Sequence, residues 1–244
     1  AGISRRTGER VTYTSRGHLL SSLDASLKRL AVDHVDLWQV HVWTDETPVE
    51  ETLTALDLAV SSGRASYVGV SNYTGWQTAQ AATWQRAVPG RTTLASTQVE
   101  YSLLNRGIER EVLPACAALG LGVLPWSPLG RGVLTGKYLP GQPVPEGSRA
   151  TDPTGSTFMS RYLNDDVLTR VQRLRPIAEG AGLTLAQLAV AWVLQNDNVS
   201  AAIIGASRPE QAAENAKAAG VRLEADVLAA IDEIFAEVIQ RDPE

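Results

Sequence analysis

The stretch GVLPWSPLGRGVLTGKY, residues 122–138, joins a short apolar strand to a glycine-rich loop. Trp126 directly follows the strand, which is predicted over residues 121–125. The loop contains three glycines, Gly130, Gly132 and Gly136. In α/β proteins this order presents a flat ring and bare backbone N–H groups to a bulky anionic ligand. A ligand loop is one interpretation, and a buried tryptophan before an ordinary turn is the other, because both kinds of loop carry glycines.

Strands recur along the chain at an almost constant interval. His41, Ser71, Gln98 and Trp126 lie near the carboxyl ends of four predicted strands and are separated by 30, 27 and 28 residues. A strand–helix unit of this size is typical of a parallel sheet with crossover helices, and short, even connections favour a (β/α)₈ barrel. No G-x-G-x-x-G follows a strand, which argues against an open dinucleotide-binding sheet. We therefore predict an α/β fold, a TIM barrel, with residues 1–244 in a single domain.

Apolar spacing and breaker residues predict the remaining elements. Strands are expected over residues 35–42, 66–72, 95–101, 121–125 and 199–204, the first of them buried. Helices are expected after Ser15 as far as Leu30, between Pro48 and Gly63, and over residues 75–88, 108–119, 165–181, 185–196, 208–219 and 225–239. Residues 1–14 are predicted to be a polar loop, and residues 130–164 a long irregular insert.

The strand count is short for a closed barrel. Five strands are predicted, whereas a TIM barrel has eight, and the first predicted helix has no strand before it. An open barrel would expose sheet edges and core. We therefore expect about the first three strands of the barrel to be absent from this chain, which would make the barrel N-terminally incomplete.

Composition and charge narrow the class of protein. The net charge of −5 is spread without blocks, which argues against a nucleic-acid partner, and the apolar runs are too short for a membrane helix. No signal-peptide pattern opens the chain. The single cysteine, Cys116, cannot form an internal disulfide and is expected to fill the core. A reducing, cytoplasmic location is the simple inference.

Hydrogen-bonding side chains stand where a barrel would place its chemistry, at the carboxyl ends of strands. His41 could donate to a substrate oxygen or move a proton, with a satisfied core histidine as the alternative. Ser71, Asn72 and Gln98 could grip a carboxamide, although each alone could be a local cap or turn residue. His18 and His34 are predicted to lie at the surface. We predict no metal site, because no cluster has ligand spacing.

A candidate anion site lies in GASRPEQAAENAKA, residues 205–218. Ser207 and Glu210 fit a capping box, and Pro209 suits a first helical turn. Arg208 beside a helix N-terminus could bind phosphate, which barrels often hold near their last two strands. An ordinary capped helix is the plainer interpretation, and a sugar-phosphate enzyme using Arg208 as a clamp is a third.

Together these residues resemble the aldo-keto reductases, in the branch of potassium-channel β-subunits and bacterial NADPH-dependent reductases. The matching segments are VDLWQVH (35–41), GVSNY (69–73), TQVEYSLLNR (97–106), LPWSPLGRGVLTGKY (124–138) and IIGASRPEQAAEN (203–215). The resemblance implies a (β/α)₈ barrel that binds NADP(H) and reduces an aldehyde or ketone to an alcohol by hydride transfer. It also implies a small carbonyl substrate as partner and leaves a homo-oligomer open. A nicotinamide-nucleotide-binding regulatory subunit without significant turnover is the alternative function.

The resemblance assigns roles residue by residue. His41 matches the catalytic histidine, Ser71, Asn72 and Gln98 match the carboxamide-holding groups, and Trp126 matches the aromatic that stacks on the nicotinamide. The loop along the pyrophosphate corresponds to Ser127, Pro128, Leu129, Gly130, Gly132 and Lys137, with Arg149 in a strap over it. The adenosine and 2′-phosphate end corresponds to Gly205, Ser207, Arg208, Gln211, Glu214 and Asn215. The other members of the family's catalytic tetrad, an aspartate, a tyrosine and a lysine, have no match, and none of the six tyrosines stands in the tyrosine's context.

Overall fold

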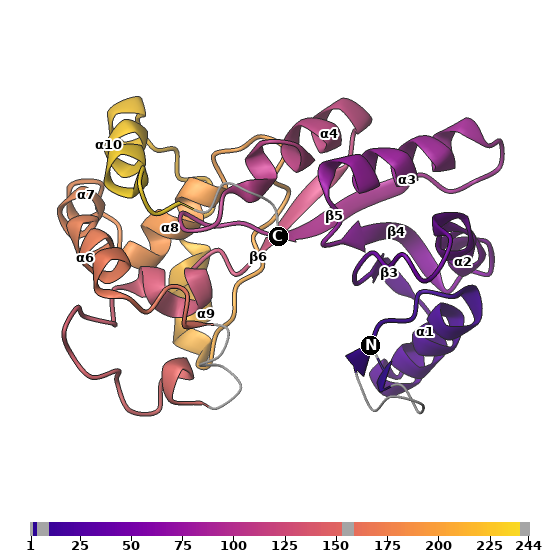
Figure 1. Ribbon diagram of the computed structural model, residues 1–244, viewed down its shortest axis with the longest axis horizontal. Coiled ribbons are helices and arrows are strands. Elements are labelled where there is room, and N and C mark those ends of the chain that lie inside the picture. Colours follow the sequence, from indigo (N-terminus) through magenta and orange to yellow (C-terminus); the bar gives the residue numbers. More distant parts are fainter. Residues whose placement is uncertain (1, 4–9, 153–158, 240–244) are drawn as a thin grey trace. The chain divides into compact units, whose positions relative to one another are not determined.

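The computed structural model describes residues 2–3, 10–152 and 159–239. The chain divides into two compact units (Figure 1). The first unit comprises Ala1–Val99 and Glu111–Val123, and the second comprises Glu100–Arg110 and Leu124–Glu244.

The strands predicted at an even interval form one sheet. They are β3 (Val35–Val40), β4 (Ala65–Ser71), β5 (Leu94–Glu100) and β6 (Gly122–Trp126), in the order β3-β4-β5-β6. The β3–β4 and β4–β5 pairings are parallel, as the crossover helices require. All four predicted strands therefore exist, with ends that differ by one or two residues from the sequence prediction.

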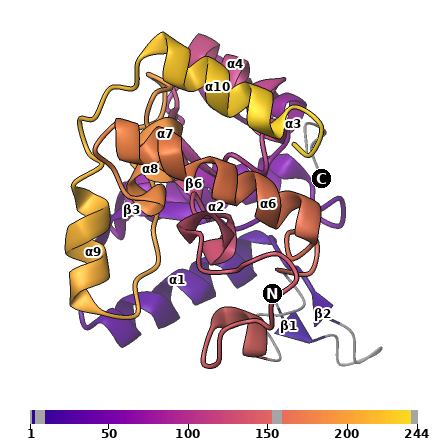
Figure 2. The same ribbon diagram turned by 90° about the vertical axis from the view of Figure 1, so that its left-hand side faces the viewer.

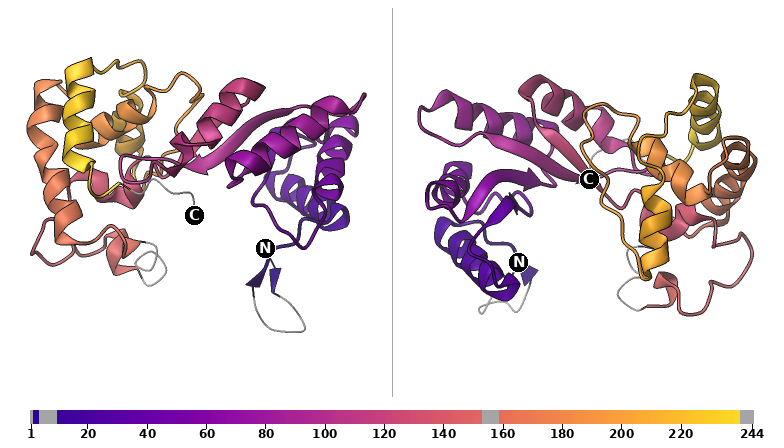
Figure 3. Two further views of the ribbon diagram at one scale, coloured as in Figure 1. Left: turned by 45° about the horizontal axis from the view of Figure 1, so that its top comes forward. Right: turned by 180° about the vertical axis from the view of Figure 1, so that it is seen from behind.

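Helices of the first unit follow the strands. They are α1 (Arg16–Leu30), α2 (Val49–Ser61), α3 (Gly75–Ala87) and α4 (Val112–Leu119). Their ends reflect local chemistry: Thr74 and Gln77 form a capping box on α3, and Gly120 ends α4 at a φ of 63°. Figures 1 and 3 show α3 beside α4, and α1 packs against α2.

Two expectations about the first unit are wrong. The predicted loop over residues 1–14 includes a short antiparallel pair, β1 (Gly2–Ile3) with β2 (Arg10–Val11). The first predicted strand is not buried, because β3 is the last strand on its side of the sheet in the described chain. Leu37 of β3 is exposed, and Tyr67 of β4 beside it is 62% exposed. The opposite face is buried, with Val68 and Val70 fully inaccessible, and α2 packs on β4.

The second unit is mainly helical (Figures 2 and 3). Its elements are the short helices η1 (Gly107–Glu109), η2 (Gly130–Thr135) and η3 (Arg149–Thr151), and the helices α6 (Asp165–Arg173), α7 (Arg175–Gly180), α8 (Leu185–Val193), α9 (Pro209–Ala216) and α10 (Ala225–Phe235). The single helix predicted over residues 165–181 is two helices, because Pro176 in the first turn of α7 cannot continue α6. The helix predicted over residues 108–119 likewise divides into η1 and α4.

The strand predicted over residues 199–204 is also wrong. Ile203 makes an isolated parallel bridge with Trp126, and its N–H donates to the carbonyl oxygen of Pro125 at 2.7 Å. Ala201 and Ala202 before it offer little side chain to pack on a pleated surface. This segment thus follows the end of β6 without forming a strand of its own.

No single helix among the described residues is long and apolar enough to cross a membrane. Asp165–Gly180 and Leu185–Val193, which lie at 87° to each other, are long and apolar enough for a membrane span only when the two segments are taken together.

Candidate functional site

Hydrogen bonds join the carboxyl ends of β4 and β5. Ser71, the last residue of β4, is the register partner of Gln98. The buried Ser71 hydroxyl donates to the Gln98 carbonyl oxygen at 2.7 Å, and the Asn72 N–H donates to the same oxygen at 2.9 Å. These bonds fix the backbone that carries the three residues predicted to hold a carboxamide.

Asn72 also connects β4 to the end of β3. Its side-chain amide donates to the His41 carbonyl oxygen at 2.9 Å and to the Ser71 hydroxyl at 3.1 Å. Asn72 has a φ of 55°, a left-handed conformation that asparagine tolerates better than most residues. His41, one residue beyond β3, has an exposed side chain. The structure thus brings together the four site residues predicted in the first unit.

The side chain of Gln98 has a partner that the sequence prediction omitted. Its Nε2 donates to Oε1 of Gln39 at 2.8 Å. Gln39 lies inside β3, one position before the buried Val40, and is itself half-buried. Gln39 could have been found from the sequence, because it is a polar residue in the apolar run VDLWQVHV, two positions before His41.

An aromatic group lies just beyond β3 and β4. The ring of Trp43 makes edge contacts with Tyr73, at 5.2 Å between centroids, and with Trp76, at 5.4 Å. The Trp43 indole N–H donates to Asp45 at 2.8 Å, and Trp76 is 57% exposed. Burial raises the pKa of the Tyr73 hydroxyl far above its ordinary value, so this phenol stays protonated. The group therefore offers an apolar surface that begins two positions after His41 in the sequence.

In the second unit, Trp126 is the last residue of β6 and is half-buried. The guanidinium carbon of Arg131 lies 5.4 Å from its ring centre, within cation–π range. Glu100 forms ion pairs with Arg161, at 2.8 Å, and with Arg131, at 3.9 Å. Arg131 and Glu100, neither of them predicted from the sequence, thus set the environment of the Trp126 ring.

The loop after Trp126 has unusual backbone geometry. Left-handed φ values between 52° and 100° occur at Ser127, Gly130, Arg131 and Gly132. The N–H groups of Gly130 and Gly132 donate to the carbonyl oxygens of Ser127 and Leu129, both at 2.9 Å, so hydrogen bonds within the loop close these turns. Pro128 is buried, and Leu129 packs against the cluster formed by Val190, Ala191 and Ala218. The apolar residues Pro128 and Leu129 therefore anchor the loop, and its glycines add no side chains to it.

Three of the predicted cations have no acidic partner. In the described parts of the chain, no carboxylate pairs with Lys137, Arg149 or Arg208, and all three side chains are exposed. A methyl group at Gly132 would lie 3.6 Å from the Lys137 amino nitrogen, so the Lys137 side chain extends over that glycine. Unpaired cations are the groups that can bind phosphate without first breaking an ion pair.

The capping box predicted for Ser207 and Glu210 is wrong. Pro209 is the first residue of α9, so Arg208 occupies the N-cap and Ser207 lies before it. Gln211 replaces Glu210 as the reaching side chain: its Oε1 accepts from the Ser207 N–H at 2.9 Å and lies 3.1 Å from the Ser207 hydroxyl. The arrangement still leaves Arg208 at a helix N-terminus, which favours an anion.

The other predicted residues at this end differ in exposure. Asn215 is buried, whereas Gly205 is exposed. The Glu214 side chain pairs with Lys217 at 2.6 Å, and its carbonyl oxygen accepts from Gln187 at 2.9 Å. Glu214 thus already has a cationic partner, and Asn215 is part of the packed side of α9.

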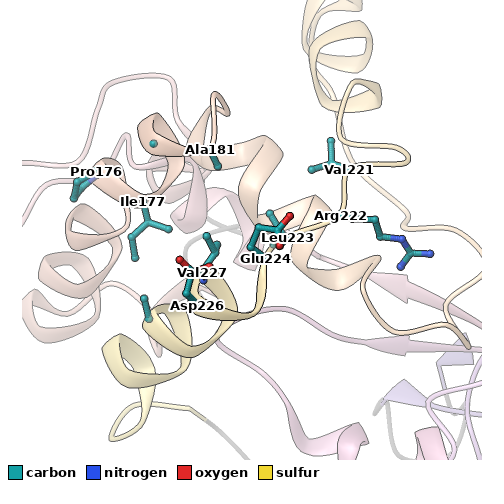
Figure 4. Close-up of a pocket in the computed structure, with 11 residues that line it drawn as sticks. Pro176, Ile177, Ala181, Val221, Arg222, Leu223, Glu224, Asp226 and Val227 are labelled. Atoms are coloured by element: carbon teal, nitrogen blue, oxygen red, sulfur yellow. Dashed lines mark hydrogen bonds between the residues drawn. The ribbon is translucent and has the colours of Figure 1, made fainter.

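A pocket of about 530 Å³ lies elsewhere in the second unit (Figure 4). Its apolar lining includes Ile177, Leu223 and Val227, with Arg222 and Asp226 among the charged residues. None of the predicted site residues lines it. In the residues that the structure describes, no group of three or more His, Cys, Asp or Glu side chains could hold a metal ion.

Sequence comparisons define the class of the protein. The model of the aldo/keto reductase family matches residues 3–236. The chain therefore belongs to the aldo/keto reductase family, whose fold is the TIM barrel, and the four parallel strands with their crossover helices are the α/β architecture predicted from the sequence.

Individual relatives carry several names. A rice protein named "probable voltage-gated potassium channel subunit beta" is 42% identical over 211 residues, which are 85% of this chain and 63% of the rice protein. The L-glyceraldehyde 3-phosphate reductase of Escherichia coli K12 is 37% identical over 221 residues, 89% of this chain and 63% of the enzyme. An uncharacterized oxidoreductase of Bacillus subtilis is 36% identical over 225 residues, 91% and 64% of the two chains. The chain thus spans somewhat less than two thirds of the length of these relatives.

Proposed function

We propose that the protein is an NADPH-dependent oxidoreductase that reduces an aldehyde or ketone to an alcohol. The observation that carries the proposal is the set of unpaired cations, Lys137, Arg149 and Arg208, at the positions where the family resemblance expects phosphate groups. A dinucleotide with a 2′-phosphate carries the negative charges that such cations bind. NADP(H), when bound, would supply the hydride.

The residues of each unit fit a part of that ligand. In the first unit, Ser71, Asn72 and Gln98 offer amide and hydroxyl groups for a carboxamide. In the second unit, Trp126 offers a stacking face, and the exposed side chains of Lys137 and Arg149 offer positive charge for a pyrophosphate. Arg208 at the N-cap of α9 would bind the 2′-phosphate.

His41 is the residue that we assign to the carbonyl substrate. Its exposed imidazole can donate a hydrogen bond to the carbonyl oxygen and so stabilise the charge that develops there during reduction. The hydrogen bond from Asn72 to the His41 carbonyl oxygen fixes the backbone from which the imidazole projects. The apolar surface of Trp43 and Trp76 would favour small carbonyl compounds with an apolar substituent.

A nicotinamide-nucleotide-binding regulatory subunit without significant turnover is the second candidate. The 42% identity to a rice protein named as a potassium channel subunit favours it. Both candidates bind the dinucleotide, so turnover discriminates between them. Oxidation of bound NADPH by a panel of aldehydes and ketones supports the reductase, and tight binding with no oxidation supports the regulatory subunit.

Fluorescence titration with NADPH tests the proposal. Replacing Trp126 by alanine should weaken binding by about 1–3 kcal/mol, the usual effect of removing an aromatic side chain at a binding hot spot. Trp84→Ala is the matched control, because Trp84 is 38% exposed on α3 and contacts Arg91 away from the predicted residues. Equal affinities of wild-type protein and Trp126→Ala would contradict the role of the ring, and no binding by wild-type protein would refute the proposed function.

A further inference from the structure

Three residues on adjacent strands lie in register across the first unit. Gln39 of β3 pairs with Gly69 of β4, and Gly69 pairs with Ser96 of β5. The missing side chain of Gly69 allows Gln39 to reach across β4, and Gln39 Nε2 lies 3.1 Å from the Ser96 hydroxyl oxygen. A methyl group at Gly69 would lie 2.5 Å from that oxygen and 3.3 Å from Cγ of Gln39. The contact between Gln39 and Ser96 therefore requires glycine at this position.

The surroundings determine the orientation of the Gln39 amide. Gln39 Nε2 also lies 3.4 Å from the carbonyl oxygen of Val70. A backbone carbonyl can only accept, so the atom facing it must be the nitrogen of the amide. Oε1 of Gln39 then faces Gln98, and the atom of Gln98 that lies 2.8 Å from it must be Nε2.

The orientation of Gln98 follows from the same bonds. With its NH₂ group donating to Gln39, Gln98 retains its carbonyl oxygen, Oε1, for another partner. No side chain or backbone group in the described ranges donates to this oxygen. Gln98 is half-buried at the carboxyl end of β5, where the predicted carboxamide-holding residues meet.

We propose that Gln39 is a positioning residue that holds the Gln98 side chain with its oxygen toward the ligand, so that the site selects a primary carboxamide over a carboxylate. This inference rests on the proposed function, since it concerns the nicotinamide end of the same dinucleotide. A carboxamide has N–H donors for Gln98 Oε1, whereas a carboxylate would place oxygen against oxygen. Gln39 itself does not touch the ligand in this proposal and acts through Gln98.

The test compares two dinucleotides by isothermal titration calorimetry. NADP⁺ carries the carboxamide, and nicotinic acid adenine dinucleotide phosphate carries a carboxylate in its place. Wild-type protein should bind NADP⁺ more tightly. Gln39→Met nearly preserves side-chain length and volume but has no amide, so the Gln98 side chain can turn either way. The preference for NADP⁺, measured as the dissociation constant of the carboxylate dinucleotide divided by that of NADP⁺, should then fall by about tenfold, the effect of one hydrogen bond to a charged group. Ser96→Ala removes only the hydrogen bond between Gln39 Nε2 and the Ser96 hydroxyl, so it should lower this ratio less.

Gln85→Leu is the matched control. Gln85 is a buried amide of the same unit that donates to Asp57 and to the Thr92 carbonyl oxygen, so its loss should leave the ratio unchanged. If Gln39→Met binds both dinucleotides more weakly by the same factor, the variant has lost only structural support, and the inference is overturned. Wild-type protein that binds both dinucleotides equally well also overturns it. Wild-type protein that binds neither dinucleotide overturns the proposed function itself, and the inference with it.

Discussion

The side-chain amide of Asn72 donates a hydrogen bond to the main-chain carbonyl of His41 over 2.9 Å, between residues 31 positions apart in the chain. Because the donor sits in a left-handed conformation, Asn72→Ala both removes this bond and places an alanine at a φ of 55°. We expect it to lower the free energy of unfolding by about 1–3 kcal/mol, measured by urea denaturation.

Asn72→Gly separates the two contributions. Glycine adopts positive φ without a steric penalty, so this variant loses the hydrogen bond but not the conformation. It should be more stable than Asn72→Ala. Equal stability of the two variants would show that the backbone at residue 72 is not strained, and wild-type stability of both would show that the bond to His41 contributes nothing.

Arg208 should distinguish NADPH from NADH. Arg208→Ala removes the unpaired cation at the N-cap of α9, and we expect it to weaken NADPH binding by about tenfold, the scale of a charged hydrogen bond, while NADH affinity stays the same. Arg222→Ala is the control, because Arg222 is also exposed and lies 3.8 Å from Asp197. A parallel loss of both cofactors, measured by fluorescence titration, would mean that Arg208 does not recognise the 2′-phosphate.

Element boundaries were predictable where a single residue sets the backbone. Pro48 precedes α2, and Gly120 at a φ of 63° ends α4, both as expected from the sequence. The break between α6 and α7 also had a visible signal, Pro176, but the apolar spacing on both sides suggested one continuous helix. Proline and glycine therefore predicted element boundaries correctly where they were given more weight than the apolar spacing.

The hydrogen bonds between strands could not be predicted in the same way. Gln39 and Gln98 are 59 positions apart, and their contact depends on how β4 and β5 are aligned. The register shifts between Val68 and Gly69, so that Gly69 pairs with Ser96 although Val68 pairs with Leu94. A slip of one residue would send Ser96 and Gln98 to the opposite face, and no short motif specifies that irregularity. The strand ends indicated the candidate site residues, and the register determined their hydrogen-bond partners.

Cys116 should resist thiol reagents in the folded protein. It is fully buried, and burial raises the pKa of its thiol from 9.0 to about 12, so thiolate is scarce at pH 8. Labelling by a chromogenic disulfide should be slow in buffer and rapid in concentrated urea, with Cys116→Ala as the unlabelled control. Fast labelling of the folded protein would contradict the burial.

The same shift predicts a loss of stability at alkaline pH. Because the folded-state pKa lies above the unfolded value of 9.0, the folded protein binds the proton more tightly. The contribution is therefore fully present below pH 9 and is lost as the pH rises toward 12. The free energy of unfolding should decline over this range, and the decline should be smaller in Cys116→Ala. An identical pH dependence of the two proteins would exclude a contribution from the thiol.

Two helical glycines should respond oppositely to alanine. Gly75, the first residue of α3, lies against α4, and a methyl group there would lie 2.3 Å from Cβ and 2.9 Å from the carbonyl carbon of Glu111. Gly17, the second residue of α1, has nothing within 4 Å of the corresponding position. Gly75→Ala must push α3 and α4 apart and should destabilise the protein by about 1–3 kcal/mol. Gly17→Ala meets no obstacle and should stabilise it by about 0.4–1 kcal/mol, because alanine loses less backbone entropy on folding. Urea denaturation measures both changes. Since neither glycine has a positive φ, stabilisation by both substitutions would mean that α3 and α4 are not in close contact at Gly75.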